Sequence, residues 1–545
     1  MNSRSLGHRA PLLWLMLPFI GGLAVAKLTG CRLVLPPLLL ALAAAAAAVL
    51  ANGGKTRCWA AAVIMAMTLA GVGTYAFHRA RLPGWDMRPP REAQVSLKVT
   101  RVFSQADPKR ATGVATVTRS GAHLGDLTGQ KIYFSVTLRK GEPPPLRSAV
   151  MSVVGVVMTL PVDPPADTFD GYLAGAGINF RLTRGRVLAI ERPALRYYRF
   201  CARAGARCHE ILGHGIAEKR PALAGLLRAM MLGTTHELSE EQHILFMQSG
   251  TMHLFAISGL NIGVIAGALQ TLLVLIRLPP WARFGIGAVL LWLFVDITGA
   301  SPSAVRAFAM AVFLQAAFVL RRPANLLAAL LVSAFGVLLV SPLQLFSASF
   351  LMSYTIVIAL LVLGLPLSEF WTGWWTPWRN LPKPVWQWWQ SALDYAWRSS
   401  AAAIAIGIAT TLVSLITGVQ FFQLLTPGSL AANLVLIPAA MIVTLAGFAS
   451  LLSGLVGCDS GAALCNHAAA LVLWLIETFV RISVKLPGAF VPARFETAWL
   501  GSATLVLLLV ALLAGYAGRW ERSHGGWWPP FAIVALVLIF GVNFE

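Results

Sequence analysis

The sequence predicts a polytopic α-helical membrane protein with an inserted extracytoplasmic domain, a small β-barrel of the OB-like type. Hydrophobic residues make up 57% of the 545 residues and charged residues only 12%, whereas a soluble globular protein carries roughly 25% charged residues. Apolar stretches long enough to span a bilayer recur along most of the chain. Residues 91–192 instead contain short alternating runs, which are typical of strands.

The apolar stretches predict two groups of transmembrane helices. The first group forms an N-terminal membrane domain over residues 1–77, with helices at 11–28, 33–51 and 58–77. No small-residue cleavage site follows the first stretch, so we interpret it as a helix and not as a removable signal peptide. The second group forms a membrane domain over residues 251–545, with helices at 251–276, 283–299, 303–320, 324–341, 345–366, 399–418, 427–455, 466–486, 498–516 and 529–543.

Basic residues in the connections predict the orientation of these helices. Arg4 and Arg9 precede the first helix, and Arg321 with Arg322 separates two later ones. The positive-inside rule places such connections in the cytoplasm, which puts residues 78–200 outside. The chain as a whole has a formal net charge of +21. Two explanations of the excess of basic residues stay open. One is the enrichment of Lys and Arg in cytoplasmic loops, and the other is attraction to a polyanion.

The predicted outer domain, residues 78–200, contains five strand-like runs, at 95–103, 113–119, 131–138, 149–158 and 178–184. Five strands in about 100 residues fit an OB-type barrel, a fold often used to bind oligonucleotides. Residues 91–192 hold 14 Lys and Arg against 8 Asp and Glu. Aromatic residues for base stacking are Phe103, Tyr133, Phe134 and Phe180. A spacer barrel without DNA-binding activity stays an alternative.

Two further segments are predicted to lie at the membrane surface. Residues 201–250 are moderately apolar with many charged residues, and we expect amphipathic interfacial helices there. Residues 371–398 are rich in tryptophan, which anchors helices at the headgroup level. A disulfide bridge would suit Cys458 and Cys465, which flank a Asp-Ser-Gly stretch, better than Cys201 and Cys208.

A conspicuous motif runs from residue 250 to residue 267. Gly259, Gly263 and Gly267 recur every four residues, which predicts a smooth helix face where another helix approaches closely. Ser258 and Asn261 lie on a neighbouring face. These two polar residues either bond across a tight helix contact or line a polar conduction path.

Five blocks of this sequence, in order along the chain, resemble the ComEC family of competence proteins, channels that bring DNA through the bacterial cytoplasmic membrane. The most specific block is His253-Leu-Phe-Ala-Ile-Ser-Gly-Leu260, preceded by Met231-Leu-Gly233. Asn261 stands where the family commonly has His. The other blocks are at 169–178, 298–307, 341–350 and 427–438.

The resemblance implies a channel for single-stranded DNA, set in the lipid bilayer of the bacterial cytoplasmic (inner) membrane. It also implies a separate DNA receptor and a cytoplasmic ATPase or helicase as partners, since this sequence has no phosphate-binding loop with Lys-Ser/Thr. The candidates for lining the DNA path are Arg306, His253, Ser258, Asn261 and Asn433.

The histidines lack the His-x-His-x-Asp spacing of a metallo-β-lactamase-like domain, which many family members carry at the C-terminus. We therefore expect a form without that domain, no metal, no cofactor and no catalytic residues. One alternative is a membrane hydrolase or transferase with His253, Asp296 and Arg306 in a pocket. Another is a non-conducting scaffold for competence partners. A structural ion pair of Arg306 with Asp296 is the simpler explanation of that arginine.

Overall fold

The computed structural model describes residues 11–544, except 51–55, 80–81, 87, 104–106, 108, 140, 142, 163, 166–167, 256, 321–324, 377, 379–380, 487, 498 and 522–525. The loop cations Arg4, Arg9, Arg321 and Arg322 lie outside the described residues. The chain divides into two units, which are described separately. The first comprises Met1–Ile211, Leu232–Glu237 and Leu269–Phe350, and the second comprises Leu212–Met231, Leu238–Ala268 and Leu351–Glu545.

The predicted polytopic helical architecture is confirmed. Across the part of the chain that the structure describes, nine helices are long and apolar enough to cross a membrane. They are Arg57–His78, Met252–Leu275, Pro280–Ile297, Pro302–Val319, Ala348–Trp374, Trp388–Phe422, Ser429–Leu455, Asp459–Val484 and Leu500–Ala517. Shorter apolar helices are Leu13–Thr29, Leu35–Leu50, Pro221–Leu232, Leu326–Val340 and Trp528–Phe540.

In the first unit, α2 (Leu13–Thr29) and α3 (Leu35–Leu50) both pack on α4 (Thr56–His78). Two glycines bring α2 and α4 together. A Cβ at Gly22 would overlap the carbonyl oxygen of Thr68, and one at Gly71 would overlap that of Phe19. Only glycine allows this approach between the two backbones, as in other small-residue helix contacts in membranes.

The same unit contains α11 (Pro280–Ile297), α12 (Pro302–Val319) and α13 (Leu326–Val340), in which each helix packs on the next. A short 3₁₀ segment, η5 (Pro342–Phe346), follows α13 and leads into α14 (Ala348–Ala359). The prediction of a helix starting at residue 345 is therefore wrong for its first turn, because Pro342 and the extended Ser347 interrupt the backbone.

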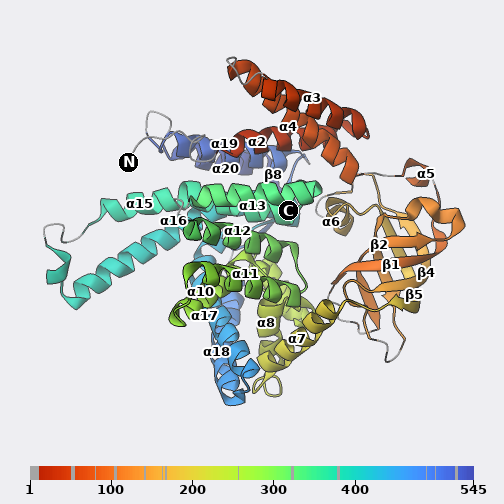
Figure 1. The fold of residues 1–545 in the computed structure, drawn as a ribbon. Helices are drawn as coiled ribbons and strands as arrows, with labels where there is room; N and C mark the ends of the chain where they lie inside the picture. The colour runs from red at the N-terminus through yellow and green to blue at the C-terminus, as the bar shows by residue number, and fades with distance from the viewer. Residues whose placement is uncertain are drawn as a thin grey trace. The chain divides into compact units, whose positions relative to one another are not determined.

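The predicted five-stranded barrel is also confirmed (Figure 1). Its strands are β1 (Arg91–Phe103), β2 (Arg110–Ser120), β3 (Lys131–Thr137), β4 (Val150–Thr159) and β5 (Phe180–Arg192). They close in the order β1-β2-β3-β5-β4, with β3 and β5 parallel and all other pairs antiparallel. A single short helix, α6 (Phe169–Gly175), lies in the connection from β4 to β5.

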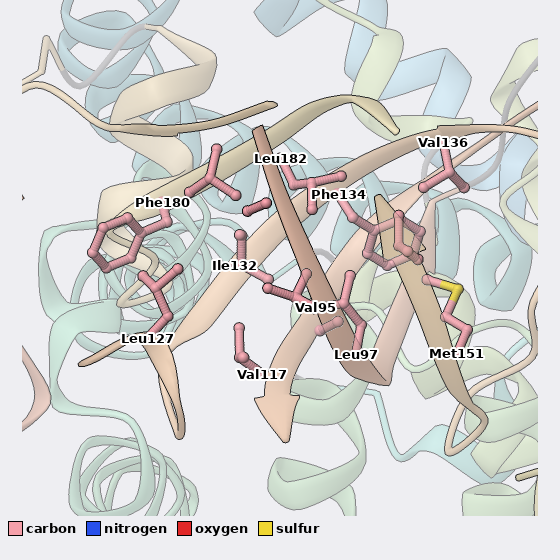
Figure 2. Packing of buried hydrophobic residues seen from close by; sticks show 14 of the residues in the cluster. Val95, Leu97, Val117, Leu127, Ile132, Phe134, Val136, Met151, Phe180 and Leu182 are labelled. Atoms are coloured by element: carbon pink, nitrogen blue, oxygen red, sulfur yellow. The ribbon is translucent and has the colours of Figure 1, made fainter. Parts of the chain in front are cut away.

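The barrel interior is filled by alternate residues of each strand. Ile132, Phe134 and Val136 of β3 are buried while their neighbours face outward. Figure 2 shows Phe134 and Phe180 among the packed side chains of this core. The prediction that Phe134 and Phe180 are available for base stacking is therefore wrong, because both rings fill the barrel and are at most 1% exposed.

The second unit is built on long helices. In it, α15 (Leu365–Trp374) packs on α16 (Trp388–Phe422), and α17 (Ser429–Leu455) packs on α18 (Asp459–Val484). α17 continues through Pro438 as one helix. α16 starts well before the predicted residue 399, because the Trp-rich tract forms its first turns. Trp374 and Trp388 are highly exposed, and their anchoring at headgroups stays a prediction.

Three features of the second unit differ from the sequence-based expectation or go beyond it. A three-stranded sheet forms from β6 (Leu424–Leu425), β7 (Val491–Phe495) and β8 (Val542–Phe544), strands too short to show an alternating pattern. α8 (Pro221–Leu232) is buried along nearly its whole length, so it does not lay one face on lipid. Cys458 and Cys465 are free thiols, as are Cys201 and Cys208 of the first unit.

Candidate functional site

The polar site of the first unit centres on Arg306, in the second turn of α12. Gly299 and Ala300 adopt positive φ angles of 87° and 48° and reverse the chain after α11. Ser301 then caps α12, since its side chain accepts from the backbone N–H of Ala304. This start of the helix carries Arg306 into the unit interior, where its side chain is only 1% exposed.

Three uncharged acceptor atoms bond to the Arg306 guanidinium. Nη1 donates to the Oε1 of Gln344 at 3.3 Å. Nη2 donates to the carbonyl oxygen of Ser349 at 2.8 Å and to its Oγ at 2.6 Å. The predicted structural pair of Arg306 with Asp296 is therefore wrong, because these amide, carbonyl and hydroxyl oxygens hold the guanidinium.

The break between α13 and α14 supplies those acceptors. Ser341 (φ −142°, ψ 74°) and Ser347 (φ −86°, ψ 136°) are not helical, so η5 turns its polar groups toward α12. Irregular backbone at membrane depth is tolerated where it is buried in protein or lines a water-filled cavity. Ionisable side chains buried among transmembrane helices are rare, and they often mark substrate or ion pathways.

Asp296, at the end of α11, has its own partners. Its Oδ1 accepts from Arg147 Nη1 at 2.9 Å, and its Oδ2 accepts from the Tyr197 hydroxyl at 2.8 Å. Arg147 comes from the loop before β4, and Tyr197 comes from α7 (Arg196–Gly213). Partial burial and the bond to Asp296 raise the pKa of Tyr197, which keeps its hydroxyl a donor. Asp296 therefore joins the barrel to two helices.

The hydrolase alternative required Asp296 and Arg306 in one pocket with His253. The partners of Asp296 and Arg306 differ, as described above, and His253 belongs to the other unit. Its Nδ1 lies 2.9 Å from the carbonyl oxygen of Gly250. No observation in the described residues favours this alternative.

Asn261 is a buried link between helices of the second unit. Its Nδ2 donates to the carbonyl oxygen of Met230 in α8 at 3.1 Å, and its Oδ1 accepts from Thr444 of α17 at 3.4 Å. Asn261 is only 3% exposed. Of the two interpretations of this residue, the structure supports the bond across a tight helix contact.

Two other residues predicted to line the DNA path, Ser258 and Asn433, do not bond across a helix contact as Asn261 does. Ser258 caps α10 (Gly259–Leu275), because its Oγ accepts from the N–H of Asn261 at 3.3 Å. Asn433, on α17, has a buried Oδ1 to which no donor among the described residues is bonded. The buried Oγ of Ser429, one turn earlier, is in the same state. A buried polar atom of this kind calls for a water or a ligand.

Arg306 belongs to the first unit, and the other four path candidates belong to the second. The predicted cavity shared by Arg306 with Ser258 or Asn261 stays a prediction.

The structure shows no close helix contact at two of the three glycines of the predicted seam on α10. A Cβ at Gly263 or Gly267 would meet no described atom within 4 Å, and Gly259, Gly263 and Gly267 are exposed. Spacing alone does not show which glycines meet another helix. Gly22 and Gly71 of α2 and α4 do so.

We expect Gly71→Leu to destabilise the protein strongly and Gly263→Leu to leave its stability nearly unchanged. A leucine at Gly71 would collide with backbone atoms of α2, which cannot move aside as a flexible side chain can. A leucine at Gly263 meets open space. Thermal unfolding of both variants purified in detergent measures the difference, and equal midpoints would contradict the assignment of the contact.

Sequence reasoning missed the groups that hold Arg306. Gln344 and Ser349 both lie in the block at 341–350, which resembles the family but does not by itself indicate ligands for the arginine. The abundance of polar side chains in the block at 341–350, within an otherwise apolar region, was the one feature of the sequence that could have indicated partners for Arg306. Arg147 carried no such signal, since nothing local distinguishes it from other basic residues of the outer domain.

Comparisons with known proteins agree with this architecture. Residues 230–520 match the family described as Competence protein, and this match spans more than half of the chain, including Arg306 and its two partners. A 142-residue segment is 27% identical to ComE operon protein 3 of Bacillus subtilis (strain 168). That segment is 26% of this chain and only 18% of the relative's length. No solved structure matches. The chain, a multi-pass helical protein with a small β-barrel, is a member of the Competence protein family.

Proposed function

We propose that this protein passes single-stranded DNA across the bacterial cytoplasmic membrane during natural transformation. Membership in the Competence protein family supports a role in DNA uptake. The observation that carries the more specific proposal is the Arg306 site, a buried guanidinium held by neutral oxygens beside a helix break.

The chemistry of the site favours a phosphate as its substrate group. Burying a guanidinium costs several kcal/mol unless good partners offset the lost hydration. A phosphate oxygen is charged, as the guanidinium is, so it attracts Arg306 more strongly than a neutral oxygen does. Arginine also binds phosphate with two parallel donors. A passing phosphate therefore replaces Gln344 and Ser349 favourably, and these two acceptors take the guanidinium back when the phosphate leaves.

The barrel supports the proposal from the other end of the path. Its excess of basic residues attracts a polyanion, and our orientation of the helices puts it outside the cytoplasm. Under the proposal a separate receptor delivers the DNA, and a cytoplasmic ATPase or helicase pulls it inward.

The test compares Arg306→Gln with Arg277→Gln, which removes the same charge from an exposed loop of the same unit. We expect Arg306→Gln to lower transformation frequency on the order of a hundredfold or more, because several kcal/mol of phosphate stabilisation is lost. Arg277→Gln is expected to transform normally. Protein levels in the membrane are measured for both.

Wild-type transformation by Arg306→Gln at normal protein levels would refute the path through Arg306. Transformation that is lost without the gene, but fully restored by the Arg306→Gln protein, would indicate the scaffold instead.

A further inference from the structure

We infer that the barrel carries a stacking platform for unpaired bases at its junction with α6. The aromatic platform consists of the rings of Phe103, Tyr133, Phe169 and Tyr172 together with the guanidinium groups of Arg101 and Arg181. Naming single-stranded DNA as the ligand rests on the proposed function. The platform itself rests on the geometry of these side chains.

The rings come from separate elements and gather at one place. Phe103 ends β1, Tyr133 lies on β3, and the other two belong to α6. The ring centroids of Tyr133 and Phe169 are 5.2 Å apart, nearly perpendicular at 80°. Phe169 and Tyr172 stack at 6.0 Å, and Phe103 and Tyr133 at 6.3 Å. The result is a group of flat apolar surfaces held in fixed orientations.

Two arginines flank these rings. The Arg181 guanidinium carbon is 5.7 Å from the Tyr133 ring and 5.8 Å from the Phe169 ring. The Arg101 carbon is 5.2 Å from the Phe103 ring, and its Nη1 donates to the Tyr172 hydroxyl at 2.9 Å. Aromatic faces for bases beside cations for phosphates are the two parts that single-strand binding surfaces combine.

Exposure distinguishes the platform from the barrel core. Phe169 is 45% exposed and the other five members are partly buried, whereas Phe134 is fully enclosed. Tyr133 and Tyr172 also pack on a small apolar cluster formed by Leu160, Leu173 and Ile178. That packing fixes the rings before any ligand arrives, which reduces the entropy lost on binding.

The position of α6 within the first unit connects the platform to Arg306. A Cβ at Gly175 would lie 3.6 Å from that of Ser347, and one at Gly177 would lie 3.2 Å from Leu343. α6 therefore contacts η5, which carries Gln344, the partner of Arg306. By analogy, OB barrels bind oligonucleotides at the β1–β2 and β4–β5 connections, and α6 occupies the second of these. A strand stacked here lies at the approach to the Arg306 site.

The test uses the full-length protein in lipid nanodiscs and a fluorescein-labelled oligothymidylate of about 20 nucleotides. Phe169→Leu keeps an apolar side chain but removes the aromatic face, and Phe169→Tyr keeps the face. We expect anisotropy titration to give a Kd roughly 5- to 100-fold higher for Phe169→Leu, the effect of losing one base stack. Phe169→Tyr is expected to bind within about twofold of wild type.

The arginines provide a control for charge. Arg181→Gln and Arg186→Gln each remove one positive charge from the same strand. Arg181 belongs to the platform and pairs with Asp170 at 2.8 Å, whereas Arg186 is exposed and lies outside the platform. We expect only Arg181→Gln to weaken binding beyond the general effect of one lost cation. An abasic oligonucleotide of equal length and charge should bind the wild type and Phe169→Leu equally, because it has no bases to stack.

Equal binding of oligothymidylate by wild type and Phe169→Leu would overturn the platform. An equal loss for the abasic strand would also overturn it, since the residue would then act through packing alone. Neither result bears on the Arg306 path, which transformation by Arg306→Gln tests separately.

Discussion

Gln344→Glu is expected to abolish DNA uptake while leaving the protein as stable as the wild type or more so. The glutamate carboxylate would replace an amide oxygen that lies 3.3 Å from Arg306 Nη1. It would convert a hydrogen bond from the charged guanidinium to a neutral acceptor into a buried ion pair of nearly the same shape. In a low-dielectric environment that pair gains several kcal/mol of attraction, and a passing phosphate would have to displace it.

This substitution separates transport from structure, because it adds an interaction to the site and removes no side-chain atom that packs there. We expect transformation frequency to fall on the order of a hundredfold or more. Gln344→Met is the matched control, since it removes the acceptor without adding charge, and it should lower uptake by less than about tenfold. Thermal unfolding of each purified variant reports stability. Normal transformation by a stable Gln344→Glu protein would show that the charge of Arg306 is not used.

Asp296→Ala is expected to lower the stability of the protein, because it removes two long-range contacts of the first unit. The Asp296 side chain is only 2% exposed and accepts from Arg147 and Tyr197. The partners left behind are solvent-accessible, since the Arg147 side chain is 39% exposed and Tyr197 is 41% exposed. Water therefore replaces part of the lost bonding, and the expected cost is about 1–3 kcal/mol. The barrel would then lose its polar link to α11 and α7.

The control is Asp107→Asn, which breaks a pair with Arg110 in which both side chains are at least half exposed. Exposed pairs of this kind contribute about 0–1 kcal/mol. Thermal unfolding in detergent should show a drop of several degrees for Asp296→Ala and almost none for Asp107→Asn. Asp296→Asn should fall between them, since the amide oxygen still accepts one hydrogen bond. Equal midpoints for Asp296→Ala and wild type would contradict the assigned link.

The membrane class and the barrel followed from composition and periodicity. Apolar stretches of about 20 residues have few stable alternatives to transmembrane helices. Alternating runs such as 131–138 form strands, because one face must pack against a core. The five predicted runs match the five strands of the barrel, with boundaries that differ by up to eight residues, as at the end of β5. The sequence also identified Arg306 as a candidate, because placing a charged side chain in an apolar membrane segment costs free energy.

The tertiary structure decided the partners of these residues. Arg306 bonds to groups 38 and 43 positions along the chain, and Asp296 bonds to groups 149 and 99 positions away. The repeating glycines of α10 and the pair in α2 and α4 are equally suited to close packing, yet only the second pair meets another backbone. A sequence pattern shows what a helix face can tolerate. Which side chain or backbone lies opposite depends on how distant segments pack, and that arrangement assigns Gln344 to Arg306, Arg147 to Asp296 and Phe169 to the face of the barrel.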